Sequence, residues 1–431
     1  MELKKDLFII NTHSDNFLVY APLRRAAFYA NNKAILVVQK YLENNLSEED
    51  KKTKVWGYIQ TLEKTDPYIP QGKDIQIGSN LTIILSQLCN LACSYCYAQK
   101  SRSKEILSRD KLQKTIDYIL QDRSSENKRF SFIGGGEPTL TWDLLEWAIK
   151  YIYSSKKEGQ KIHCSIITNG TLLTDERIKF LREYGIYVGI SFDILPDIQN
   201  AQRRYAYSEL KSFDAIHEVV YKLYKYNVNC NGFRSTITKR NVHLMVDMVN
   251  FVAENYKNIK YLNFEQVTDI DNNDKEFFEN YVENFFKARK IGKVYGIEVY
   301  NSISKSVDTL KQKFCSREFC LTPTGDIVSC HRISSNKERN FSSFCIGNVN
   351  DQVNINSLQV DKVLNVIKAQ KLECEKCFAK WHCAGGCISE RLLLSKEQQS
   401  DKCNFTKNII IRILEEKLAT DKKGGVNKNV K

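Results

Sequence analysis

Residues 81–99 read LTIILSQLCNLACSYCYAQ, a short apolar run followed by three closely spaced cysteines. The apolar run contains β-branched residues and predicts a buried strand. Cys89, Cys93 and Cys96 lie in the loop that follows this strand. A closed structural zinc or iron–sulfur site takes four ligands, so three thiols leave one position open. The identity of the missing fourth ligand is the question that this stretch raises.

The composition is that of an ordinary globular protein. Of the 431 residues, 42% are hydrophobic and 27% are charged. No window approaches the roughly 18 apolar residues of a membrane span, and the N-terminus carries no long apolar segment. We therefore expect a cytoplasmic protein without a membrane partner. In a reducing compartment its 14 cysteines are more often metal ligands than disulfides.

The net charge of +13 raises the question of a nucleic-acid partner. Lys and Arg are interleaved with Asp and Glu, and no basic stripe carries aromatic residues. A solvated, lysine-rich surface explains this charge, with an acidic peptide partner as the alternative. No nucleic-acid partner is expected.

A strand–helix rhythm fills the middle of the chain. Strands are predicted at 81–85, 129–133, 161–167, 186–192, 232–238 and 259–264. Helices are predicted between them at 108–121, 141–154, 174–184, 213–226 and 242–256. Six such units predict an α/β fold with a parallel sheet, a partial (βα)6 barrel of the TIM type. A complete barrel would need two more units, which the sequence does not contain.

Unusual residues recur where these strands end. Cys89 follows the first strand, GGGEP at 134–138 the second and TNG at 168–170 the third. Ser191 and Asp193 end the fourth strand, and Phe264 and Glu265 end the sixth. Because parallel barrels concentrate chemistry at the carboxyl ends of their strands, we expect one mouth with one active site.

The C-x3-C-x-aromatic-C spacing, followed by GGGEP, resembles the radical S-adenosylmethionine (SAM) enzymes. The resemblance implies a 4Fe–4S cluster on Cys89, Cys93 and Cys96 whose fourth ligand is SAM, which is cleaved to a 5′-deoxyadenosyl radical. A zinc site completed by a distant residue, or simple buried thiols, is the alternative.

Further SAM contacts are implied by similarity to members of this superfamily that act on peptides. Tyr95 and Phe264 would contact adenine, Gly135 and Gly136 would allow close backbone approach, and Glu137 would meet the methionyl ammonium. Ser191 and Arg203 would bind the ribose and carboxylate. The aromatic residues could instead belong to the core, and Arg203 to the surface. Ile194 replaces the glycine usual in the related S-x-D-G motif.

Eight further cysteines follow the barrel and resemble the SPASM extension of peptide-modifying radical SAM enzymes. The patterns are CLTPTGDIVSC at 320–330 and CEKCFAKWHCAGGC at 374–387. The resemblance implies two auxiliary 4Fe–4S clusters, one on Cys315, Cys320, Cys330 and Cys387 and one on Cys374, Cys377, Cys383 and Cys403. The alternative is a zinc ribbon, because CxxC pairs occur in both kinds of site. Cys164, Cys230 and Cys345 stay unassigned.

These observations predict four segments. Residues 1–78 form a small α+β cap whose sheet edge could bind a leader peptide, or which could simply pack on the main domain. Residues 79–295 form the partial barrel, 296–410 the cysteine-rich extension, and 411–431 a helix end with a basic flexible tail.

The resemblance implies an oxidoreductase that modifies a ribosomally made precursor peptide through an intramolecular thioether, C–C or C–O crosslink. Its partners would be the leader-bearing peptide and an electron donor such as flavodoxin or ferredoxin. The alternative is an anaerobic sulfatase-maturating enzyme, which forms formylglycine from Cys or Ser. Such enzymes carry an aspartate where this chain has His331, which we regard as a candidate catalytic proton acceptor or a structural histidine. A passive electron-transfer module would explain the cysteines but not GGGEP.

Overall fold

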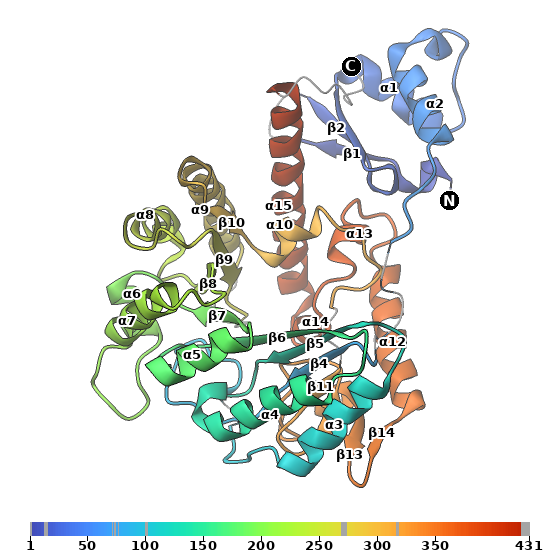
Figure 1. The fold of residues 1–431 in the computed structure, drawn as a ribbon. Coiled ribbons are helices and arrows are strands. Elements are labelled where there is room, and N and C mark those ends of the chain that lie inside the picture. Colours follow the sequence, from blue (N-terminus) through green and yellow to red (C-terminus); the bar gives the residue numbers. More distant parts are fainter. Residues whose placement is uncertain are drawn as a thin grey trace.

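A large, mainly parallel sheet organises the molecule (Figure 1). The structure is a computed structural model that describes residues 2–12, 16–70, 72, 75, 77–99, 102–268, 274–315 and 319–423. Its parallel strands are β4 (Asn80–Ile83), β5 (Asn127–Phe132), β6 (Lys161–Thr168), β7 (Tyr187–Ser191), β8 (Gly232–Ile237), β9 (Tyr261–Gln266) and β10 (Glu298–Tyr300). The six predicted strands are confirmed. The short β10 adds a seventh strand beside β9, and among the described residues it ends the sheet, so the barrel stays open.

Helices cover the outer face of this sheet (Figure 1). They are α3 (Arg109–Gln121), α4 (Trp142–Ser155), α5 (Asp175–Glu183), α6 (Pro196–Gln202), α7 (Ser212–Lys225), α8 (Met245–Asn255) and α9 (Lys275–Tyr295). Their starts are fixed by capping: the side chains of Ser108, Thr174 and Asp274 accept backbone N–H groups of the first turns of α3, α5 and α9. Apolar residues at helical spacing are buried against the strands, which forms the main core.

The cysteine-rich segment continues the barrel sheet. β11 (Cys320–Leu321) pairs in parallel with β4, and β12 (Asp326–Val328), β13 (Cys345–Val349) and β14 (Val353–Ile355) follow antiparallel. The helices are α10 (Ser302–Ser306), α11 (Phe341–Phe344), α12 (Ser357–Leu372), α13 (Lys380–Cys383), α14 (Ile388–Arg391) and α15 (Lys396–Lys423). Cys320 is the register partner of Thr82 on β4, so this segment is anchored directly to the barrel.

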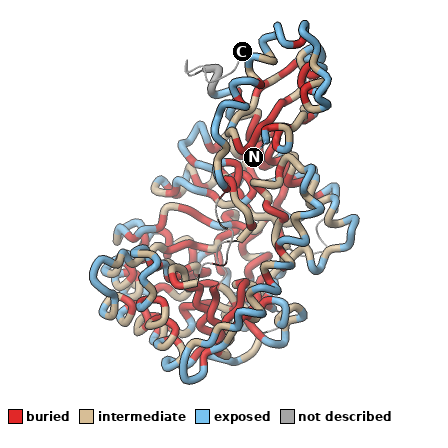
Figure 2. The backbone as a smooth tube through the Cα atoms, turned by 90° about the vertical axis from the view of Figure 1, so that its right-hand side faces the viewer, coloured by how far each residue is buried: buried red, intermediate tan, exposed pale blue. Residues whose placement is uncertain are grey.

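The N-terminal segment has a sheet and a core of its own. β1 (Phe8–Asn11), β2 (Phe17–Ala21) and β3 (Ala26–Ala30) are antiparallel and pack with α1 (Asn32–Leu42) and α2 (Lys54–Lys64). We did not predict α2, which follows the charged residues 47–53 and buries Ile59 and Leu62. Figure 2 shows buried backbone in this segment as well as in the barrel.

Two buried contacts attach the N-terminal segment to the cysteine-rich segment. Tyr20 Oη lies 2.5 Å from His382 Nε2, and Trp381 Nε1 donates to Asp6 Oδ1 at 2.7 Å. Trp381 and His382 lie on α13 and immediately precede Cys383. The long helix α15 contacts α9, α10 and β3, and so joins all three parts of the chain (Figure 1). The predicted boundaries at 78, 295 and 410 stay predictions, and the end of the predicted tail, 424–431, lies outside the described residues.

No helix in the described ranges is both long and apolar enough to span a membrane.

Lys128 on β5 gives a test of the barrel's stability. Its side chain is fully buried, and Nζ donates to Gly78 O at 2.7 Å and to Asp122 O at 2.6 Å. Lys128→Met should lower the free energy of unfolding by at least about 2 kcal/mol, because each buried acceptor left without a donor costs about 1–3 kcal/mol. Urea unfolding measures this change. Lys161→Met, at an exposed position of the neighbouring strand, should stay within about 0.5 kcal/mol of the parent. Equal stability of the two variants would refute this role for Lys128.

Candidate active site

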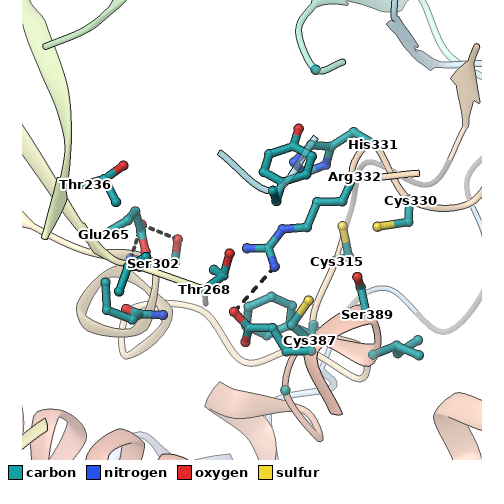
Figure 3. Close-up of a pocket in the computed structure, with 18 of the residues that line it drawn as sticks. Thr236, Glu265, Thr268, Ser302, Cys315, Cys330, His331, Arg332, Cys387 and Ser389 are labelled. Atoms are coloured by element: carbon teal, nitrogen blue, oxygen red, sulfur yellow. Dashed lines mark hydrogen bonds and ion pairs between the residues drawn. The ribbon is translucent and has the colours of Figure 1, made fainter. Parts of the chain in front are cut away.

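A cavity of about 420 Å³ lies where the carboxyl ends of the barrel strands meet the cysteine-rich segment. Figure 3 shows Thr236, Glu265 and Ser302 on one side, facing the side that carries Cys315, Cys330, Arg332 and Cys387. The predicted site residues that line it are Cys89, Cys93, Tyr95, Cys96, Gly135, Gly136, Glu137, Ser191, Arg203, Cys315, Cys330, His331, Cys383, Cys387 and Cys403. The structure thus brings the strand ends and much of the cysteine-rich segment to one space.

The three-cysteine loop is held against the segment that follows α6. Ala92 N donates to Arg204 O at 2.8 Å and Ser94 N to Gln202 O at 2.9 Å. Within the loop, Cys96 N donates to Cys93 O at 3.1 Å, so these two cysteines share one turn. The loop is thereby positioned by backbone contacts, before any cofactor is considered.

Of the three cysteines in this loop, Cys93 is buried, and Cys89 and Cys96 are half-buried. Burial raises the pKa of Cys93 to about 12 and also raises that of Cys89. Such thiols stay protonated at neutral pH unless a cation compensates the thiolate charge. Arg102 supplies one, since its Nη2 donates to Cys96 Sγ at 3.5 Å. The iron ions of a cluster would also compensate the thiolate charge, so these three cysteines fit an iron–sulfur cluster.

The glycines of GGGEP serve packing between protein segments. A Cβ on Gly136 would lie 1.9 Å from Leu88 O, and one on Gly135 would lie 2.8 Å from Ser86 O. A Cβ on Gly134 would lie 2.9 Å from the backbone carbonyl oxygen of His331. The turn is therefore wedged between the three-cysteine loop and the Cys330 loop, and glycine is required for that contact.

Glu137 links this turn to the end of β6. Its Oε1 accepts from Thr139 N and Oγ1 and from Thr168 Oγ1, and its Oε2 accepts from Asn169 N at 2.7 Å. Burial raises the pKa of Glu137, while these donors lower it. Oε1 is saturated by three donors, so Oε2 is the oxygen that retains capacity for a further donor.

Asp193 holds Tyr95 and Arg203, two side chains that line the cavity. Its Oδ2 accepts from Tyr95 Oη at 2.7 Å and lies 3.2 Å from Arg203 Nε, and the guanidinium also lies over the Tyr95 ring. Arg203 is thus not a surface residue, since only 7% of it is exposed. Ile194 has φ +67° and is fully buried. The backbone here has the left-handed conformation that favours glycine, although the residue is a β-branched isoleucine.

The structure does not place Phe264 in the cavity. Phe264 is fully buried in the main core, and its backbone oxygen accepts from Tyr281 Oη of α9. Side chains alternate between the two faces of a strand, so Phe264 faces the helices while Glu265 reaches the cavity. The predicted adenine contact of Phe264 is corrected accordingly. Glu265 is fixed by Asn263 Nδ2 and by Ser302 N and Oγ.

The eight C-terminal cysteines fall into two neighbourhoods. Cys330 interacts electrostatically with Cys315 and Cys387, and Cys320 packs beside Cys330 in a small core. Cys383 interacts with Cys374, Cys377 and Cys403. The assignment of these cysteines to two clusters stays a prediction, and Cys320, Cys374 and Cys377 do not line the cavity itself.

The spacing of these thiols bears on which group they fit. No group of three or more His, Cys, Asp or Glu side chains in the described part of the chain could hold a single metal ion. Zinc requires its ligands about 2.0–2.3 Å from one point. As they are placed in the described part of the chain, these thiols do not converge on a zinc position. Cys164 and Cys230 are buried in the barrel core and Cys345 is half-buried on β13.

No sequence motif predicts the charged residues Arg332, Glu390 and Lys402, which line the cavity beside the first cysteine set. Arg332 Nη1 lies 3.4 Å from Glu390 Oε1, and Lys402 Nζ lies 3.8 Å from Glu390 Oε2. The Arg332 guanidinium also lies over the ring of Tyr97. These residues are distant in sequence and follow no motif. Asp193 and Glu265 were recognisable only by their position at strand ends.

Comparison with known proteins assigns the domain. The model of the radical SAM superfamily matches residues 83–252. A cysteine-type anaerobic sulfatase-maturating enzyme of Clostridium perfringens is 26% identical over 348 residues, which cover 74% of this chain and 90% of that enzyme.

Two solved structures share the fold. Native anSMEcpe with bound AdoMet has a TM-score of 0.65 at 21% identity and covers 78% of this chain and 98% of its own. Streptococcus suis SuiB bound to precursor peptide SuiA has a TM-score of 0.51 at 14% identity and covers 92% of this chain and 97% of its own. The chain contains a radical SAM domain and is an enzyme that uses radical chemistry.

Proposed function

We propose that this enzyme cleaves SAM and oxidatively modifies a ribosomally made precursor peptide, forming an intramolecular thioether, C–C or C–O crosslink. The observation that carries the proposal is the shared cavity, which joins the three-thiol loop to thiols of both C-terminal sets. Three 4Fe–4S clusters would supply a one-electron donor to SAM and acceptors for the electron that the substrate loses.

Each set of residues has a part in this proposal. Cys89, Cys93 and Cys96 would hold the cluster that binds SAM, and the eight C-terminal cysteines would hold two further clusters. Glu137 Oε2 accepts the methionyl ammonium, and Ser191 and Arg203 orient the rest of SAM. Tyr95 contributes a ring edge, held by its hydrogen bond to Asp193. Gly135 and Gly136 would let the backbone of the GGGEP turn approach SAM closely.

His331 is the proposed proton acceptor. It follows Cys330 and lines the cavity, so a substrate bound there lies within its reach. SAM, when bound, would supply the radical that takes a hydrogen atom from the substrate, and the clusters held by the C-terminal cysteines would accept one electron. His331 would accept the proton that is lost when the crosslink forms. A histidine suits this step because its usual pKa is near neutral.

The peptide partner enters through the N-terminal segment in this account. The sheet of β1, β2 and β3 has edges that an extended leader could join by main-chain hydrogen bonds. The SuiB structure contains a bound precursor peptide, which supports a peptide substrate here. A flavodoxin or ferredoxin would supply electrons. The free cysteines suit a reducing cytoplasm.

Anaerobic sulfatase maturation is the second candidate, favoured by the 26% identity to the Clostridium perfringens enzyme. Against it, His331 occupies the position where the resemblance expects an aspartate.

Coexpression with a candidate precursor peptide, taken from any short peptide gene found beside this one, tests the choice. Mass spectrometry should find the peptide lighter by two hydrogens, with the crosslink located by fragmentation. A matched sample should contain the His331→Ala enzyme, which should give less product. An unmodified precursor, together with an aldehyde on a cysteine peptide of sulfatase type, would replace this proposal with the second candidate.

A further inference from the structure

Five arginines line the cavity, and four of them are held by an oxygen of the protein. The four contacts are Arg102 with Leu91 O, Arg203 with Asp193, Arg332 with Glu390 and Arg391 with Glu373. Arg234 is the exception. Its guanidinium is exposed and makes no hydrogen bond or ion pair with the residues that the structure describes. The protein thus leaves one cation of the cavity wall without an acceptor.

The strand register places Arg234 on the inner face of the barrel sheet. Phe233, its neighbour on β8, packs in the main core against the rings of Phe192 and Tyr256, with centroids 5.2 Å and 5.3 Å away. Successive side chains of a strand point to opposite faces, so Arg234 points away from this core and into the cavity. Its register partner on β7 is Ser191. Neighbouring strands lie about 4.8 Å apart, so Arg234 is next to a residue that we assign to SAM.

Glu265 supplies an acceptor on the same wall (Figure 3). It lies on β9, and its register partner on β8 is Thr236, two residues after Arg234. Its Oε1 accepts from Asn263 Nδ2 at 3.0 Å and from Ser302 N at 2.8 Å, so this oxygen is fixed and occupied. No described residue donates to Oε2, and Glu265 forms no ion pair with Arg234. A guanidinium and a carboxylate oxygen are therefore both available to a ligand in the cavity.

The chemistry of these two groups selects the kind of ligand. A guanidinium binds a carboxylate through two parallel N–H···O bonds, and such charge-assisted bonds are about twice as strong as neutral ones. The net charge of +13 also favours an acidic ligand. The fixed carboxylate of Glu265 disfavours a phosphate, which carries more negative charge, but it can accept a backbone N–H. A peptide with a carboxylate side chain satisfies both groups.

We propose that Arg234 binds the carboxylate of an Asp or Glu side chain in the substrate peptide, and that Glu265 Oε2 accepts a backbone N–H of the same peptide. The inference rests on the proposed function and adds the class of substrate, a peptide with an acidic residue close to the residue that is modified. Because Ser191 is the register partner of Arg234, the acidic residue is held beside the site that we assign to SAM.

Synthetic pentapeptides added to the anaerobically reconstituted full chain test this site. Each has the sequence Ala-Ala-X-Ala-Ala with blocked ends, where X is Asp, Glu, Asn or Gln, and nuclear magnetic resonance titration at physiological salt gives the dissociation constants. The parent should bind the acidic peptides about tenfold more tightly than the amide peptides, because hydrogen bonds to a charged group are worth at least that factor. Arg234→Gln should remove this preference, and Arg234→Lys should keep part of it.

Arg240→Gln is the control for this test, because Arg240 is exposed shortly after the same strand and does not line the cavity. It should keep the full preference, which excludes a general effect of positive charge. Formation of 5′-deoxyadenosine without peptide should stay near the parent value in Arg234→Gln. Equal affinity of the parent for acidic and amide peptides would overturn the inference, as would a preference that survives Arg234→Gln or a loss of nucleoside formation in that variant. Failure of the proposed function differs, because it removes the crosslinked product and leaves the preference intact.

Discussion

Cys96→Ala should abolish formation of 5′-deoxyadenosine from SAM. Cys96 belongs to the only cysteine set with three members in our assignment, and two thiolates cannot hold a cluster that keeps an open iron. Arg102 would also lose its sulfur partner. The measurement is chromatography of the nucleoside after incubating reduced, reconstituted protein with SAM. Iron content should fall by about four atoms per chain, which corresponds to one lost cluster.

Cys383→Ala is the control for the Cys96→Ala prediction. Cys383 lies in the second C-terminal set, and the three-thiol loop does not depend on it. This variant should still form 5′-deoxyadenosine, should lose a similar amount of iron, and should make little crosslinked peptide. Full nucleoside production by Cys96→Ala would contradict the assignment of the three-thiol loop. Circular dichroism of both variants distinguishes loss of a cluster from loss of the fold.

Gly136→Ala should reduce SAM cleavage by at least about tenfold, since a misplacement of about 1 Å can cost about a hundredfold in rate. The added Cβ would lie 1.9 Å from Leu88 O, a backbone atom that cannot rotate away. The turn must then shift, which breaks the 2.7 Å hydrogen bond from Glu137 N to Leu88 O beside Cys89. Overpacking of this kind also costs about 1–3 kcal/mol of stability.

Gly57→Ala provides the control for the glycine prediction. Gly57 lies in α2 of the N-terminal segment, and a Cβ there meets no atom within 4 Å. Alanine should slightly stabilise this helix, by up to about 1 kcal/mol, without affecting nucleoside formation. Thermal unfolding and the SAM assay measure both effects. Activity of Gly136→Ala equal to that of Gly57→Ala would remove the proposed contact between the two loops.

Local patterns predicted the barrel well. Runs such as KIHCSIIT and helical repeats such as that of α7 carry the burial period in the sequence itself, so the strands and helices of the barrel were recognisable. The short β10 was not, because three residues carry too little pattern. Phe264 shows a different limit: sequence marks the end of a strand, but which face a residue occupies depends on register.

The candidate site was predictable in its thiols and not in its charges. Cysteine spacing indicates which ligands lie in one loop, and the membership of the two C-terminal sets stays a prediction. The contact of Arg332 with Glu390 joins residues 58 positions apart and is set by tertiary packing alone. The same holds for the glycine turn, whose partners Ser86 and Leu88 became visible only in the folded chain.

The central claim is that one iron held by Cys89, Cys93 and Cys96 is open to SAM. Electron paramagnetic resonance spectra of the reduced, reconstituted protein, recorded with and without SAM, test it most directly. The account predicts three iron–sulfur signals, of which one changes when SAM is added. A protein that contains zinc and no iron–sulfur signal, or signals that SAM leaves unchanged, would contradict it.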